Sequence, residues 1–178
     1  MEKKKVKSKV IIILITSLIA IIIVSMTVGK ELYEGKSQSI FSFGLIHFSG
    51  YLFFLLMPVE MAFIYYLSYS KEAELIAVAL GTAISAQIID YLIGYSVSTK
   101  FINNIVGEKR IGRAEKYIKK YGNLTIFVFN LLPLSSPVIA LVAGMLKYKF
   151  RDVLIYSICG LIIKYAVLSL LFANTSLF

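Results

Sequence analysis

Three ionisable side chains lie inside long apolar segments of this chain: Glu60, Asp90 and Lys164. A charged group at membrane depth is costly unless it is paired, wetted or neutralised, so it usually marks a functional site. We therefore expect these residues to form a transport or proton-binding site. Lys164 could pair with Asp90 or with Glu60, and the sequence leaves both pairings open. The alternative role for Glu60 is a structural cap on a broken helix.

A second candidate group interrupts residues 123–147, an apolar stretch long enough to cross a bilayer. Its members are Asn130, Pro133, Ser135, Ser136 and Pro137. Proline breaks a helix, and freed backbone groups are tolerated in a membrane only where protein or water satisfies them. Freed amides and the polar side chains could bind a lipid headgroup phosphate, with the basic Arg110 and Arg113 adding charge. Alternatively, these polar groups only satisfy the broken backbone.

The composition predicts an integral membrane protein. The 178 residues are 58% hydrophobic and 16% charged, with a mean hydropathy of +0.81; a soluble domain of this length would carry more charge. The chain has one cysteine, Cys159, and one histidine, His47, so we expect no metal, no cofactor and only packing roles for both. No nucleophile–base pair stands out, and we expect neither an enzyme nor a nucleic-acid-binding protein.

The hydropathy pattern predicts an all-α, polytopic membrane protein. Residues 1–39 would form an N-terminal transmembrane helix and an outer loop, and residues 40–178 the main membrane domain. Within that domain we expect a re-entrant segment at 40–70, a helix at 75–98, a basic interfacial helix at 108–121, a re-entrant segment at 123–147 and a helix at 152–173.

The distribution of charge favours two re-entrant segments. If both 40–70 and 123–147 return to the side they left, the inner stretches collect fifteen basic and four acidic residues. The outer stretches then carry three basic and four acidic residues, as the positive-inside rule requires. This topology gives two opposed re-entrant hairpins arranged as an inverted repeat, a recurrent transporter design. It places the N-terminus in the cytoplasm and the C-terminus outside.

Small residues recur at helical spacing in two places. The sets are Ala77, Gly81 and Ser85, and Ala140 and Gly144. Such faces allow helices to approach closely in a membrane, so we expect both sets to pack against other helices.

Several motifs in this order resemble the DedA family, also called the VTT-domain or SNARE-associated Golgi protein family. They are Pro58-Val59-Glu60, Gly81, Tyr91-x-x-Gly94, the basic stretch before residue 122, Phe129 to Pro133, and Ala143-Gly144 ending eleven residues after Pro133. The chain departs from the family pattern at three positions. Ile88 stands where the family usually carries an acidic residue, with Asp90 two residues later, and Asn130 and Ser136 stand where the family usually carries arginines. The charged, bidentate contacts that arginines make with phosphate are thereby lost.

The resemblance implies a membrane transporter that moves a lipid or a lipid-phosphate carrier between bilayer leaflets, in a prokaryotic cell membrane. Its partners would be membrane lipids, either polyprenyl phosphate or phospholipid, and protons. Two alternatives stay open: a proton-coupled transporter of a small solute, and a non-transporting scaffold or lipid-binding protein.

Overall fold

The computed structural model describes residues 39–52, 59–96, 107–132 and 136–172. These residues contain seven α-helices and no strand. The helices are α2 (Ile40–Leu52), α3 (Val59–Leu67), α4 (Glu72–Ser96), α6 (Glu108–Tyr121), α7 (Asn123–Leu131), α8 (Ser136–Met145) and α9 (Phe150–Phe172). The helix expected near the N-terminus lies outside the described residues, as do Pro58, Pro133 and Ser135.

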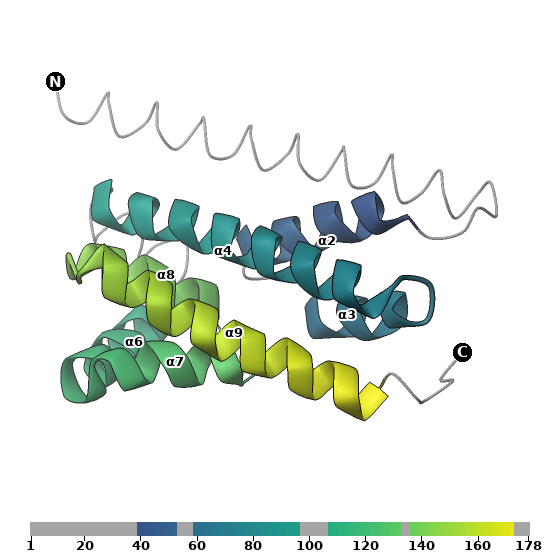
Figure 1. The fold of residues 1–178 in the computed structure, drawn as a ribbon. Coiled ribbons are helices and arrows are strands. Elements are labelled where there is room, and N and C mark those ends of the chain that lie inside the picture. Colours follow the sequence, from purple (N-terminus) through teal and green to yellow (C-terminus); the bar gives the residue numbers. More distant parts are fainter. Residues whose placement is uncertain (1–38, 53–58, 97–106, 133–135, 173–178) are drawn as a thin grey trace, which may run out of the picture.

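The two long helices α4 and α9 lie side by side and antiparallel along the molecule (Figure 1). At one end Ser169 of α9 donates a hydrogen bond to Glu72 of α4, and at the other the ring of Phe150 packs 5.1 Å from that of Tyr91. With 25 and 23 residues, they are about 37 and 35 Å long, enough for a hydrocarbon core of about 30 Å. Both pass the length and composition test for a membrane-spanning helix.

Both long helices begin earlier than the sequence predicts. We expected α4 to begin at residue 75, after a charged loop, and α9 to begin at 152, but they begin at Glu72 and Phe150. The additional residues place Glu72 and Glu74 in the first turn of α4, and Asp152 in the first turn of α9. Acidic side chains there interact favourably with the positive end of the helix dipole. Charge that reads as a loop signal therefore stabilises a helix start.

The outward face of α9 is apolar. Its exposed large side chains are Ile155, Tyr156, Ile162, Ile163, Val167, Leu170 and Leu171. A soluble protein rarely exposes an apolar surface of this length, whereas a lipid-facing helix requires one. The surface therefore agrees with the composition in assigning α9 to the membrane.

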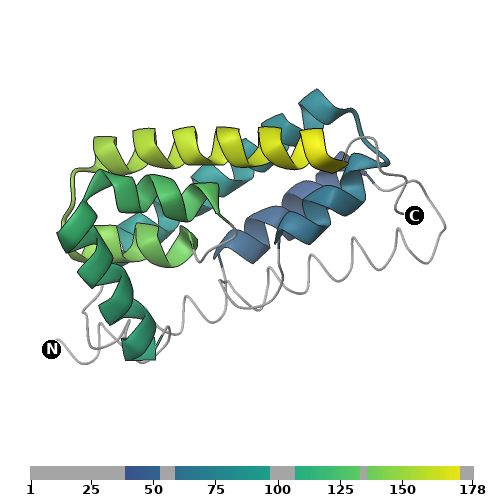
Figure 2. The same cartoon turned by 90° about the horizontal axis from the view of Figure 1, so that it is seen from below.

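The five shorter helices divide between the two ends of the α4–α9 pair (Figures 1 and 2). Helices α2 and α3 lie together at the end where α4 begins and α9 finishes, while α6, α7 and α8 lie at the other. Each group has its own apolar core: Phe43, Phe63 and Tyr66 belong to the first, and Ile126, Ile139 and Val142 to the second.

Helix α6 has the bounds expected for the basic interfacial helix, but its apolar face is already covered. Ile111, Ala114 and Ile118 are buried in the same core as α7 and α8. Tyr121, the last residue of the helix, is about half exposed. The hydrophobic face therefore binds protein, and the basic face is what remains for solvent or lipid headgroups.

Two close helix crossings depend on glycine. Gly94 of α4 and Gly144 of α8 face one another, and a Cβ on either would collide with backbone atoms of the opposite helix. At the crossing of α9 with α7, a Cβ on Gly160 would lie 2.6 Å from the carbonyl oxygen of Phe127. Of the two small-residue sets, Ala140 and Gly144 are buried as expected.

Within the described residues, Ala77, Gly81 and Ser85 do not pack against another helix as expected. All three are exposed, and in that part of the chain no atom lies within 4 Å of a Cβ added to Gly81. The spacing of small residues is the same on both helices, so only the position of the neighbouring helix distinguishes a packed face from an open one.

The same substitution at two positions of α4 tests this difference. Gly94→Ala should destabilise the protein by about 1–3 kcal/mol, because the added methyl group displaces α8. Gly81→Ala should leave stability unchanged or raise it by up to about 1 kcal/mol, because alanine favours the helix and finds open space. Thermal unfolding of the detergent-purified variants measures both. Equal effects at the two glycines would contradict the packing of α4 against α8.

Candidate functional site

The buried ammonium of Lys164 pairs with Glu60. The Nζ atom of Lys164 lies 3.0 Å from Oε1 of Glu60 and donates a second hydrogen bond, 2.7 Å long, to the phenol oxygen of Tyr51. The Lys164 side chain is 4% exposed and that of Glu60 is 18% exposed. The structure thus selects one of the two pairings that the sequence left open: Lys164 joins α9 to the first turn of α3.

The ion pair is one end of a longer chain of buried polar groups, drawn from four helices. The hydroxyl oxygens of Tyr51 and Tyr165 lie 3.1 Å apart. The Tyr165 hydroxyl is 2.6 Å from Nε2 of His47, and Nδ1 of His47 is 2.8 Å from Oγ1 of Thr82. We call Glu60, Lys164, Tyr51, Tyr165, His47 and Thr82 the lysine network.

The two ends of the lysine network set the direction of every hydrogen bond in it. At one end, the ammonium of Lys164 can only donate, so Tyr51 accepts from it. At the other end, Thr82 donates its proton to the carbonyl of Val78 at 2.7 Å, so its oxygen accepts from Nδ1–H of His47. Neutral His47 then accepts at Nε2 from Tyr165, and Tyr165 accepts from Tyr51. Each hydroxyl proton has an acceptor, either in the network or in the backbone of α4, and the connected hydrogen bonds hold the ammonium in place.

The role of His47 is a correction to the sequence analysis, which assigned it to packing. Its ring packs 4.9 Å from the ring of Tyr51 and 5.1 Å from that of Phe43, but both nitrogens are hydrogen-bonded. Its partners lie 35 and 118 residues away in the chain. A polar residue in an apolar helix was the available signal, although nothing in the sequence identified its partners.

Asp90 lies in α4 and is 1% exposed. Neither carboxylate oxygen has a hydrogen-bond partner among the residues that the structure describes. The structure places Asp90 apart from the lysine network, so it does not form the pair with Lys164 that the sequence left open.

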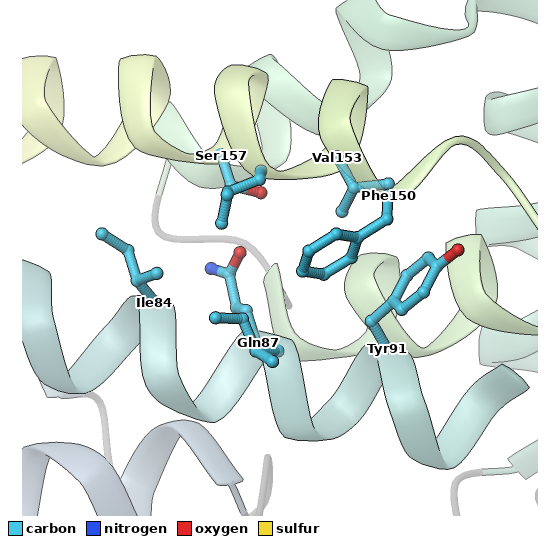
Figure 3. A pocket seen from close by; sticks show the side chains of 8 residues that line it. Ile84, Gln87, Tyr91, Phe150, Val153 and Ser157 are labelled. Carbon is cyan, nitrogen blue, oxygen red and sulfur yellow. The ribbon is translucent and has the colours of Figure 1, made fainter. Parts of the chain in front are cut away.

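Asn130 connects three helices at the other end of the molecule. Its Oδ1 accepts a 2.5 Å hydrogen bond from Gln87 of α4, and its Nδ2 donates to Ser157 of α9 at 3.1 Å and to the carbonyl of Ile126 at 2.8 Å. Figure 3 shows Gln87 and Ser157 facing one another across the space between α4 and α9. A small cavity lies between α4 and α9, beside Gln87 and Ser157. Its volume is only about 10 Å³, so it cannot hold a lipid headgroup.

The other residues proposed to bind a lipid headgroup lie in two separate regions of the structure. Ser136 and Pro137 are buried at the start of α8, whereas Arg110 and Arg113 are exposed on α6. The structure therefore does not bring the two arginines together with Asn130 and Ser136.

Two residues of the family-like motifs have structural positions. Tyr91 packs near the end of α4 and donates a 2.6 Å hydrogen bond to the carbonyl of Tyr148. Ala143, in α8, is fully buried.

The hydrogen-bond directions can be tested at His47, the only histidine in the chain. We expect a neutral ring protonated at Nδ1, because Thr82 offers an acceptor and Tyr165 a donor. The ¹⁵N chemical shifts of the untagged, histidine-labelled protein distinguish the two neutral tautomers. Thr82→Val, which removes the acceptor, should shift the population toward the Nε2–H form. An Nε2–H tautomer in the unmodified protein would contradict the proposed direction.

Comparison with known proteins identifies the family. No curated protein and no solved structure matches the chain. A family model described as the VTT domain matches residues 42–174, which is about three quarters of the chain and includes all seven helices from within α2 to the end of α9. The match covers both the lysine network and Asn130. The chain therefore belongs to the DedA family of VTT-domain membrane proteins.

Proposed function

We propose that this protein moves an amphipathic lipid with an anionic headgroup between the two leaflets of a cell membrane. The observation that carries the proposal is the lysine network, a charged and hydrogen-bonded path buried between apolar helices. A lipid crossing the bilayer needs polar contacts for its headgroup, while its tails can stay in the surrounding lipid. Polar groups at this depth are what such a path requires.

The proposal includes a topology in which α2–α3 and α7–α8 are opposed re-entrant pairs. Helices of 13, 9, 9 and 10 residues are about 20, 14, 14 and 15 Å long, so none of them can cross a core of about 30 Å. The helix contacts support an inverted relation, because α2 packs on α4 as α7 packs on α9. Likewise α3 contacts α9 as α8 contacts α4. Two opposed pairs would shorten the apolar distance that a headgroup must cross.

The basic face of α6 supports the orientation. Its exposed residues include Lys109, Arg110, Arg113, Lys116, Lys119 and Lys120. We propose that this end of the molecule lies in the cytoplasm, where anionic lipids attract basic side chains, with the N-terminus inside and the C-terminus outside. Arg110 and Arg113 would then gather lipid headgroups at the surface.

Asp90 favours a second candidate function, coupling of transport to protons. A buried carboxylate without a partner can take up and release a proton at a cost that depends on access to water. The solute could then be small and soluble instead of a lipid. In either case we propose a transporter and not an enzyme.

Leaflet exchange of fluorescent lipids in proteoliposomes tests the first proposal. The purified protein should accelerate exchange of a phosphate-bearing lipid above the rate in empty vesicles, because the lysine network stabilises the headgroup in transit. Protein carrying Gly81→Ala, an open surface position, is the matched control and should behave as the unmodified protein. The proposal would be refuted if exchange of anionic, zwitterionic and neutral lipids were no faster than in empty vesicles.

Asp90→Asn separates the second candidate from the first. If transport is driven by protons, a pH gradient should accelerate it and the asparagine variant, which cannot titrate, should lose that acceleration. Leaflet exchange measured with and without a pH gradient provides the comparison. Equal rates under both conditions in the unmodified protein would remove proton coupling, while passive exchange would stand.

A further inference from the structure

We propose that Lys164 binds the phosphate of the anionic headgroup directly, and that the headgroup and Glu60 compete for it. This inference rests on the function proposed above and gives the transport site its contact residue. In the resting state the Lys164 ammonium is paired with the Glu60 carboxylate. In the loaded state a phosphate oxygen takes its place.

Lys164 is the one buried cation among the described residues. Every other lysine and arginine in those ranges is exposed, including Arg110 and Arg113 on α6. Asn130 and Ser136, which are buried, are neutral. A headgroup that travels through the interior therefore finds one positive charge there, and a buried ammonium needs an anion whenever its own partner leaves.

The position of Lys164 does not depend on Glu60 alone. Tyr51 accepts a hydrogen bond from the ammonium, and Tyr165, His47 and Thr82 hold Tyr51 in turn. The rings of Tyr51 and Tyr165 also lie below the ammonium, each with its centroid 5.4 Å from Nζ, a distance at which a cation and an aromatic face attract. When Glu60 is released, the cation stays where it is, ready for another anion.

Glu60 is the partner that can be exchanged. It is more exposed than Lys164, 18% against 4%, so water and headgroups reach the carboxylate first. It also lies in the first turn of α3, where the helix dipole favours any anion, whether a carboxylate or a phosphate. The competing anion would thus enter a position already suited to negative charge.

The exchange requires the Glu60 carboxylate to move away from the ammonium. The N–H of Lys164 that pointed to Glu60 can then donate to a phosphate oxygen. The other polar groups around this pair are Tyr51 and His47 from α2 and Tyr165 from α9. Helix α4 contributes the hydroxyl of Thr82 to the lysine network, while Glu72 of α4 accepts a hydrogen bond from Ser169. Glu60 is therefore the acid that competes with the headgroup for Lys164.

Binding of a short-chain phosphodiester lipid, dioctanoyl phosphatidylglycerol, tests the exchange. The lipid carries one negative charge at about pH 8, where the full-length protein in detergent is titrated with it. Glu60→Gln should bind this lipid about tenfold or more tightly than the unmodified protein, because its neutral side chain no longer competes for Lys164. Thermal-shift titration gives the Kd values.

Lys164→Gln should weaken the same binding about 10- to 100-fold, as expected for loss of a charged hydrogen bond. Lys164→Gln leaves the Glu60 carboxylate without its partner, which destabilises the fold. The double variant Glu60→Gln/Lys164→Gln removes both charges, avoids that unpaired carboxylate and must also fail to bind the lipid. Glu74→Gln and Lys149→Gln make the same chemical changes at exposed positions and should match the unmodified protein.

Three results would overturn the proposal. They are weaker binding in Glu60→Gln, unchanged binding in either lysine variant, and equal binding of uncharged dioctanoylglycerol. Inorganic phosphate distinguishes a lipid headgroup from a free anion: equal binding of phosphate alone would refute the lipid assignment. Leaflet exchange by the same preparations separates the two proposals, because lysine-dependent binding without exchange would refute transport but leave the binding site standing.

Discussion

A lysine buried in an apolar helix must have its charge compensated, and much of this structure follows from that requirement. Lys164 lies in the middle of α9, and the groups that satisfy it come from α2 and α3. Tyr51 and Glu60 can reach it only if both short helices pack at that end of α9. Through Tyr165, His47 and Thr82 the same network also joins α2 to α4. One ammonium thus connects the four helices at this end.

The opposite end of the molecule is built on different chemistry. There Asn130 connects α7 to α4 and α9 through neutral hydrogen bonds, and Gly94, Gly144 and Gly160 let backbones approach one another. The amide of Asn130 has its oxygen and nitrogen already bonded, so a headgroup could bind there only by breaking those bonds. The similar arrangement of short helices at the two ends therefore carries a charged site at one end and a neutral, tightly packed site at the other.

The membrane explains why these polar groups are so fully connected. Inside a bilayer no water is present to replace a lost hydrogen bond, so an unsatisfied group is more costly than in a soluble core. The lysine network meets this constraint at every member, whereas the Asp90 carboxylate has no hydrogen-bond partner among the residues that the structure describes. The two acids therefore differ in their surroundings: the Glu60 carboxylate is paired with Lys164, and that of Asp90 is buried and unpaired within the described residues.

The sequence by itself determined the class of the protein and most of its elements. Apolar composition predicted a helical membrane protein, and local patterns predicted α6 with its bounds and the long helices α4 and α9 to within three residues at their starts. The order of motifs around Pro58, Tyr91 and Pro133 resembled the family that the domain match then showed. These properties are local, because hydropathy, helix periodicity and proline act on neighbouring residues.

Only the tertiary structure decided which residues meet. Glu60 and Lys164 are 104 residues apart, and no local pattern favoured that pair over Asp90 and Lys164. His47 looked like a packing residue because its partners are distant, and Gly81 resembled Gly144 because spacing does not reveal which face a neighbouring helix covers. The apolar side of α6 likewise faces protein and not lipid. Each of these outcomes depends on where one helix lies against another. Contacts between residues that are distant in the sequence determine those positions.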